Sequence, residues 1–309
     1  MKKNLILLMG IAAVLTACEK TILTDEDMTT YDDADRTRIT FTVNGDFHSD
    51  AATTRSCSNA EANFSLFTLH SSLTRAALAA DGKDMTDLWL LDYQDGTMKQ
   101  QLHQQTADPD FGTPSLSLPQ GSHTLYFVAS RGKQPVLSTA EHTITWGTPS
   151  DTFWQAVTLT VDENTAATQT VTLHRVTTKL SITIQDALPT DIATISLEPT
   201  NWFYALDYID GSPTGAQQQA VPISVPSSCA GQKNQSVSFF GLSGTDEWQA
   251  DITVTATDSD DNILGQTVIR NAPFKANRVT AYKGNLFNID SGFTLALDGA
   301  WDEEYSGEW

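Results

Sequence analysis

Cysteine and histidine are the residue types in this chain best suited to nucleophilic, acid–base or metal chemistry. The sequence contains three cysteines and six histidines. The histidines lack the short spacings that metal sites use, and they stand at His48, His70, His103, His123, His142 and His174. No His-Glu-x-x-His, Gly-x-Ser-x-Gly, Gly-x-Gly-x-x-Gly or phosphate-loop motif occurs. We therefore expect most histidines at the surface, and the sequence predicts no catalytic residue, metal or cofactor.

The first cysteine, Cys18, follows an apolar run at the N-terminus. Lys2 and Lys3 precede the apolar residues 5–15, and Leu-Thr-Ala then leads to Cys18. This order is typical of a secretory signal peptide, and the run is short for a membrane-spanning helix. Leu-Thr-Ala-Cys resembles a bacterial lipobox, in which the cysteine is acylated, with palmitate for example, and becomes the first residue. We expect residues 1–17 to be removed and Cys18 to anchor the chain in a membrane. The alternatives are a plain signal peptide or an apolar N-terminal helix.

The other two cysteines, Cys57 and Cys229, lie far apart in serine-rich sequence. Neither belongs to a Cys-x-x-Cys motif. An extracytoplasmic location would permit a disulfide between them. Two separate thiols are the other interpretation, and the sequence leaves both open.

The charge of the chain is strongly acidic. It has 38 acidic against 18 basic residues, a formal net charge of −20. Nucleic-acid binding needs clustered Lys and Arg, so this balance argues against a nucleic-acid partner. Residues 18–35 are acidic and almost free of apolar side chains, which indicates a flexible tether. An acidic stretch after the lipidated cysteine also resembles the surface-export signals of Bacteroidetes lipoproteins, which would place the protein outside the outer membrane.

The centre of the chain, residues 168–186, alternates apolar and polar side chains. Alternation with period 2 predicts a strand with one face in a core. The parity changes between Leu173 and Val176, so an unbroken strand would turn its second apolar set to the opposite face. We expect two strands here, with a bulge or a crossing between two sheets or domains near His174 and Arg175, and we take this point as the seam between two all-β domains. These two side chains would form a polar pair at the junction and not a catalytic pair.

Strand-like stretches separated by turn residues continue on both sides of this centre. Asp95-Gly96 lies between two of them, residues 87–93 and 97–103, which predicts a hairpin. Residues 50–80 instead predict a long loop with one short helix. Further strands are expected at 38–43, 116–118, 122–129, 142–146, 157–161, 192–197, 202–208, 236–240, 250–257, 262–269 and 278–287. The fold class is therefore all-β, with two β-sandwich domains in tandem, residues 36–175 and 176–309.

One acidic turn, residues 258–262, has part of a calcium-loop pattern. Asp258, Asp260 and Asn262 match the odd-position ligands, but Ile263 replaces the turn glycine and no glutamate occupies the twelfth position. We expect a plain turn between two strands.

Several short motifs occur in a recognisable order. They are Leu-Leu-Asp-Tyr-Gln-Asp-Gly at 90–96, Phe153-Trp154, Val-Thr-Leu-His-Arg-Val-Thr-Thr-Lys-Leu-Ser-Ile at 171–182 with Leu188-Pro189 after it, and Asn-Arg-Val-Thr-Ala-Tyr-Lys-Gly-Asn-Leu-Phe at 277–287. Together with the lipobox and its acidic start, they resemble the fimbrillin-type superfamily of Bacteroidales type V pili. Within it the closer likeness is to the anchor and accessory subunits.

This resemblance implies two transthyretin-like domains and a structural role in a fimbrium, without catalysis. Subunits of this superfamily join by β-strand addition, so the implied partners are other fimbrial subunits. Polymerising relatives lose their first strand by cleavage after an arginine, and Arg55 fits best here, with Arg36, Arg38 and Arg75 as rivals. An anchor would keep its lipidated strand, remain on the outer membrane and support adhesion.

The alternative is an outer-membrane lipoprotein that binds a glycan or another host ligand. Exposed aromatic side chains on a β-sandwich stack on sugar rings, and the platform would consist of Trp202, Tyr204, Trp248 and Trp301. This alternative predicts two or three coplanar aromatics on one open face, whereas the fimbrial interpretation requires an exposed strand edge or groove.

Overall fold

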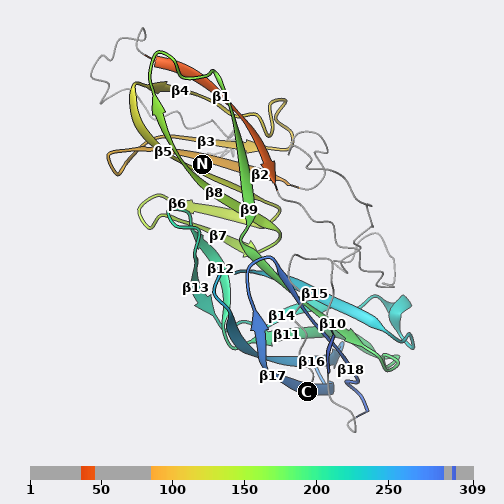
Figure 1. Cartoon of the computed structure of the whole chain (residues 1–309). Helices are drawn as coiled ribbons and strands as arrows, with labels where there is room; N and C mark the ends of the chain where they lie inside the picture. Colours follow the sequence, from red (N-terminus) through yellow and green to blue (C-terminus); the bar gives the residue numbers. More distant parts are fainter. Residues whose placement is uncertain (1–35, 46–84, 289–293, 297–309) are drawn as a thin grey trace, which may run out of the picture. The chain divides into compact units, whose positions relative to one another are not determined.

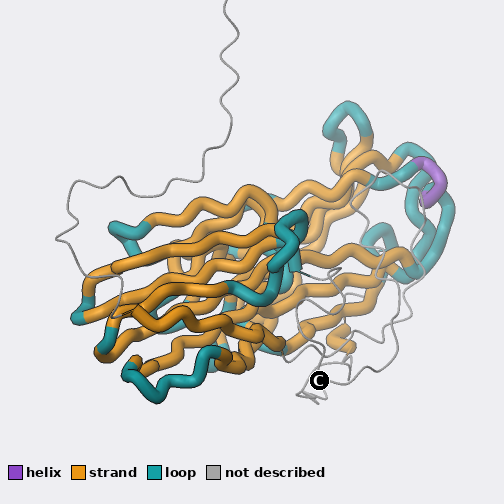
Figure 2. The backbone as a smooth tube through the Cα atoms, turned by 90° about the horizontal axis from the view of Figure 1, so that it is seen from above, coloured by secondary structure: helices purple, strands orange, loops and turns teal. Residues whose placement is uncertain are grey.

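The computed structural model describes residues 36–45, 85–288 and 294–296. Within these residues the chain consists of strands, turns and one short 3-10 helix, η2 (Ser227–Cys229). Figure 2 shows strands throughout the described part. The predicted all-β class is confirmed. The expected loop and helix at residues 50–80 lie outside the described residues.

Seven strands form the largest sheet (Figure 1). Its order is β3 (Thr97–Gln105), β2 (Asp87–Gln94), β5 (Gly121–Ser130), β8 (Thr152–Val161), β9 (Thr168–Arg175), β1 (Arg36–Gly45) and β4 (Ser115–Pro119). β8 and β9 pair at only two positions, Phe153 with Arg175 and Trp154 with His174. This weak pairing lets the sheet fold over itself, because strands from both of its ends contribute to one core.

That first core arises from alternation along each strand. Ile39, Phe41 and Val43 of β1 are fully buried, and they pack in one cluster with Leu88 and Leu90 of β2. β4, β5 and β9 add their own apolar side chains to the same cluster. Burying each large apolar side chain stabilises the fold by about 1.5–3 kcal/mol. We call this part the N-terminal sandwich.

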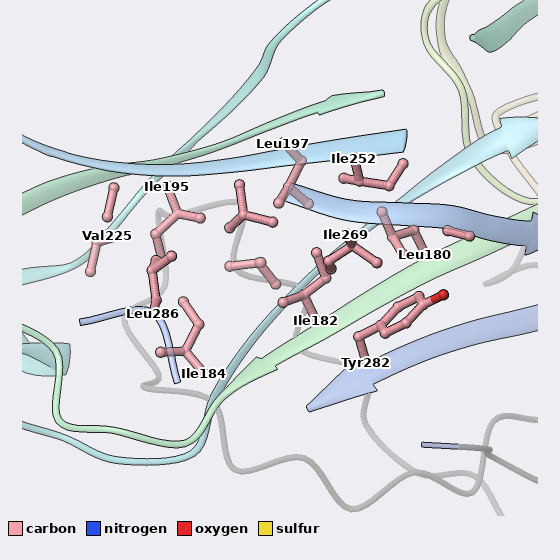
Figure 3. Close-up of a cluster of buried hydrophobic side chains, with 14 of the residues drawn as sticks. Leu180, Ile182, Ile184, Ile195, Leu197, Val225, Ile252, Ile269, Tyr282 and Leu286 are labelled. Atoms are coloured by element: carbon pink, nitrogen blue, oxygen red, sulfur yellow. The ribbon is translucent and has the colours of Figure 1, made fainter. Parts of the chain in front are cut away.

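Two four-stranded sheets form a second sandwich, the C-terminal sandwich. One has the order β15 (Gln235–Leu242), β10 (Thr177–Ile184), β18 (Arg278–Gly284) and β19 (Thr294–Ala296). The other has the order β14 (Val221–Ser224), β11 (Ile192–Pro199), β16 (Trp248–Asp258) and β17 (Ile263–Phe274). Leu180, Ile182 and Ile184 of β10 face Ile195 and Leu197 of β11 in the core between these sheets (Figure 3).

A further sheet combines strands from both halves of the sequence, and we call it the junction sheet. Its order is β13 (Pro213–Gln217), β12 (Trp202–Asp207), β7 (Thr143–Thr148) and β6 (Lys133–Ser138). β7 precedes the predicted boundary at 175/176 and β12 follows it, yet the two pair at Thr143–Thr145. The junction sheet also covers the second face of the seven-stranded sheet, where Trp89 of β2 meets Trp146 of β7. The division into domains 36–175 and 176–309 therefore stays a proposal, and one sheet crosses it.

Local expectations from the sequence are met at several points. Asp95 and Gly96 adopt φ angles of 53° and 73° and join β2 to β3 as the predicted hairpin. The parity change also marks a real crossing, because β9 and β10 belong to different sheets on either side of Val176.

Other expectations need correction. A strand was expected at residues 157–161, but β8 already begins at Thr152 and includes Phe153 and Trp154. β6, β13 and β14 were not expected, because as outer strands of their sheets they carry few buried side chains and little apolar alternation.

Candidate functional site: a clamped junction and open sheet edges

The crossing between the two sandwiches is held by a buried ionic cluster. The Arg175 guanidinium donates to both carboxylate oxygens of Asp151, at 2.7 and 3.1 Å, and to Asn277 Oδ1 at 2.8 Å. Thr177 Oγ1 donates to the same carboxylate at 3.2 Å. The Arg175 guanidinium also lies 4.9 Å from the Phe153 ring centroid. The cluster joins the start of β8, the end of β9, the start of β10 and the turn before β18, so it fixes the angle at which the chain crosses.

His174 and Arg175, which the sequence predicted to form a polar pair, lie in different environments. Arg175 is buried in this cluster, whereas the neighbouring His174 is exposed. Nothing in the cluster resembles an acid–base site with an open reaction position, since both charged groups are buried and hydrogen-bonded to one another. The arrangement is structural.

Aromatic side chains fill the space between the seven-stranded sheet and the junction sheet. The hydroxyls of Tyr93 and Tyr208 lie 2.9 Å apart, and the Tyr126 ring contacts both. Burial, together with the hydrogen bond to Tyr93, raises the pKa of the Tyr208 hydroxyl. Trp154 Nε1 donates to the backbone carbonyl of Tyr208 at 2.8 Å. This packing connects strands from the two halves of the chain.

Most histidines in the described residues lie at the surface, as expected. His103 and His142 are at least partly exposed, but His123 is completely buried beside Asp92. Asp92 interrupts the apolar run Leu90-Leu91-Asp92-Tyr93, and an acid inside such a run is the one sequence signal that could have predicted a buried partner. His48 and His70 lie outside the described residues.

The aromatic platform of the glycan-binding alternative does not form. Trp202 is fully buried and Tyr204 is 6% exposed, and both belong to the core of the C-terminal sandwich. Trp248 packs edge-to-face against Trp202, with ring centroids 5.6 Å apart. Trp301 lies outside the described residues. Trp202 and Tyr204 are therefore core residues, and Trp248 is partly buried against the same core.

The acidic turn is a plain turn, as expected. The Asp258 carboxylate accepts hydrogen bonds from the backbone nitrogens of Asp260 and Asn262, each at 2.9 Å, and from Asn262 Nδ2. These hydrogen bonds lower the pKa of Asp258. Its oxygens are used within the turn, and no group of three or more metal-ligating side chains occurs in the described part of the chain.

Exposed apolar side chains concentrate on the outer strands of sheets. The large hydrophobic side chains that are exposed in the described residues are Val136 at 63%, Ile263 at 61% and Val268 at 41%. Val136 lies on β6, the outer strand of the junction sheet, and the other two lie on β17, the outer strand of its sheet. An outer strand offers unpaired backbone groups, and apolar side chains beside them favour pairing with another chain. Among the described strands β6 and β17 each have a neighbour on one side only, and we call them the open edges.

The segment that follows β18 is held by a buried carboxylate. Asp186, just after β10, accepts hydrogen bonds from the backbone nitrogens of Leu286, Phe287 and Asn288 at 3.2, 2.8 and 3.1 Å. Beyond this point β19 pairs antiparallel with Ala281–Lys283 of β18, which continues the sheet within the same chain. The tail after residue 296 lies outside the described residues.

Several predicted site residues cannot be placed. Cys18, Arg55 and its rival Arg75 lie outside the described residues, as does Cys57. Arg36 and Arg38 belong to β1. Cys229 is a buried member of the C-terminal core. In the described part of the chain, no helix has the length and apolar character needed to cross a membrane.

A family model for a family of unknown function, DUF6562, matches residues 134–309, more than half of the sequence. The chain belongs to this family. The match begins in β6 and includes both edge strands named above. No curated protein matches this DUF6562 member.

Solved structures share the fold of this DUF6562 member. An adhesin candidate from Bacteroides ovatus aligns with a TM-score of 0.50 at 11% identity, covering 88% of this chain and 96% of that chain. A fimbrial assembly protein from Parabacteroides distasonis aligns at 0.45 and 8% identity, covering 85% and 96%. The fimbrial anchor protein Mfa2 from Porphyromonas gingivalis aligns at 0.42 and 10% identity, covering 87% and 100%. At 11% identity the likeness to the adhesin candidate concerns the fold.

Proposed function

We propose that this chain is a surface lipoprotein that serves as an anchor or accessory subunit of type V fimbriae. It joins other subunits by β-strand addition and supports adhesion, without catalysis. The lipid on Cys18 holds it on the outer face of the outer membrane. Arg55 is the proposed processing position should the first strand be cleaved.

The observation that carries this proposal is the placement of exposed apolar side chains on the open edges. Protein edge strands are commonly short, charged or covered, which discourages pairing with other chains. β17 has 12 residues and exposes Ile263 and Val268, so it lacks this protection along part of its length. The shared fold with the Bacteroides ovatus adhesin candidate supports the adhesion part of this proposal.

Deletion of the gene, combined with shearing and immunogold labelling, tests the function. We expect labelled filaments on wild-type cells, their loss on deletion, and lipid-anchored protein at filament bases. Palmitate labelling should disappear in Cys18→Ala. Cells that carry no filaments before deletion would contradict the fimbrial role.

A second set of variants tests the edge. Val268→Lys places a charge on β17, and we expect fewer or shorter filaments with unchanged protein level, because a lysine on an edge opposes pairing. Ser259→Lys, on an exposed turn, is the charge control, and Val268→Thr is the shape control. Val136→Lys tests β6 in the same assay. Normal filaments in both edge variants would show that β6 and β17 are not the sites of strand addition, without contradicting the fimbrial role.

A further inference from the structure

A buried pair of titratable side chains lies at one end of the N-terminal core. Asp92 of β2 and His123 of β5 have side chains that are 0% exposed, and Asp92 Oδ1 lies 2.7 Å from His123 Nδ1. The other ring nitrogen, His123 Nε2, lies 3.0 Å from the backbone carbonyl oxygen of Pro119 at the end of β4. β4 and β5 lie far apart in the order of the seven-stranded sheet, so the ring bridges the corner at which the chain passes between them.

The hydrogen bonds of Asp92 and His123 set the number of protons that the pair must hold. A backbone carbonyl only accepts, so Nε2 must carry a proton to make its bond to Pro119. An ionised carboxylate also only accepts, so a contact of 2.7 Å between Oδ1 and Nδ1 needs a second proton between them. That proton belongs either to an imidazolium beside a carboxylate or to a neutral imidazole beside a carboxylic acid. In both forms the pair binds one proton more than a separate carboxylate and neutral imidazole.

The surroundings hold this proton in place. Asp92 Oδ2 is buried with no hydrogen-bond partner, which disfavours a bare carboxylate. Burial raises the pKa of Asp92, against opposing contributions from His123, from Arg36 of β1 and from Lys99 of β3. β4 and the rest of β5 contribute no charged side chain. The two nearby cations are therefore the groups whose removal would raise the proton affinity of the pair.

We propose that Asp92 and His123 form a buried proton-binding site that makes the stability of the N-terminal sandwich depend on pH above neutrality. In the unfolded chain, histidine loses its proton above about pH 6.5 and aspartate above about pH 4. Between these pH values the two side chains bind the same number of protons in the folded and in the unfolded chain, so the pair adds no pH dependence to the free energy of unfolding. Above about pH 6.5 only the folded chain keeps the proton, so stability falls as pH rises, until the pair itself ionises.

Urea unfolding of the full chain at about pH 5.5, 7 and 8.5 tests the proposal. The unfolding equilibrium constant of the wild type should rise by up to tenfold per pH unit above about pH 6.5 from this pair, equal to about 1.4 kcal/mol per unit. Asp92→Asn donates an amide hydrogen to Nδ1 without a titratable proton, so the variant should lose this slope. His103→Gln removes a histidine that pairs with Asp87 but is 39% exposed, and it should keep the slope. Equal slopes in the wild type and Asp92→Asn would overturn the proposal.

A spectroscopic measurement covers the case in which Asp92→Asn does not fold. In the wild type at about pH 7, proton NMR with labelled histidine should show a proton on His123 Nε2 and a second exchange-protected proton in the hydrogen bond between His123 Nδ1 and Asp92 Oδ1, on either atom. The absence of any protected proton between Nδ1 and Oδ1 at that pH would show that the pair holds no extra proton, and the proposal would fail.

Discussion

Removal of the Arg175 side chain should weaken the fold far more than removal of an exposed arginine. In Arg175→Ala the Asp151 carboxylate, buried to 7% exposure, loses two hydrogen bonds of 2.7 and 3.1 Å. It keeps Thr177 at 3.2 Å and Arg131 at 3.7 Å. Breaking a buried pair from one side costs about 3–5 kcal/mol, because a charge stays buried without its main partner.

The chain contains a matched exposed pair. Arg270 donates to Asp251 at 3.0 Å, but its side chain is 71% exposed. Arg270→Ala should therefore cost no more than about 1 kcal/mol. Both variants and the wild type would be compared by urea unfolding at neutral pH.

A double-mutant cycle gives the decisive comparison. In Arg175→Ala with Asp151→Ala neither charge remains, so the double variant should lose less than the sum of the two single variants. Strictly additive losses, or an Arg175→Ala cost as small as that of Arg270→Ala, would refute the view that this cluster clamps the crossing.

Three further variants test the core, the C-terminal hydrogen bonds and acid sensitivity. Trp202→Ala should cost about 3–5 kcal/mol in thermal or urea unfolding, because the ring is fully buried; an unchanged stability with lost glycan binding would contradict its place in the core. Asp186→Asn should cost about 1–3 kcal/mol by urea unfolding, because both carboxylate oxygens accept backbone hydrogen bonds and the amide has one oxygen, so its NH2 group must replace one of the two acceptors; no change would show that these bonds contribute nothing. Burial raises the pKa of Asp87, but hydrogen bonds, the strongest from His103, outweigh burial and lower this pKa below 3.8. The stabilisation from the Asp87 carboxylate is therefore present above about pH 3.8 and is lost as the pH falls through the lower pKa of the folded state. The difference in unfolding free energy between the wild type and Asp87→Asn should shrink below that pH, and a constant difference would refute this.

The C-terminal region shows which strands the alternation of apolar and polar side chains can predict and which it cannot. Alternation predicted β11, β12, β15 and β16, because period 2 is a property of a strand and its own core face. It did not predict β13 and β14, whose side chains are mostly exposed. Nor did it predict that Asp186 would bind backbone amides at Leu286 and beyond, 100 residues away. Local periodicity carries no information about which distant segment arrives at a given side chain.

The sequence by itself determined the all-β class, the Asp95-Gly96 hairpin and the crossing at Val176, since each follows from neighbouring residues. Only the tertiary structure decided that β7 pairs with β12 across that crossing and that His123 is buried against Asp92. The physical reason is the same in both cases. Strand pairing and burial between remote segments depend on which surfaces exclude water together, and that is settled by packing of the whole chain and not by the pattern within any one segment.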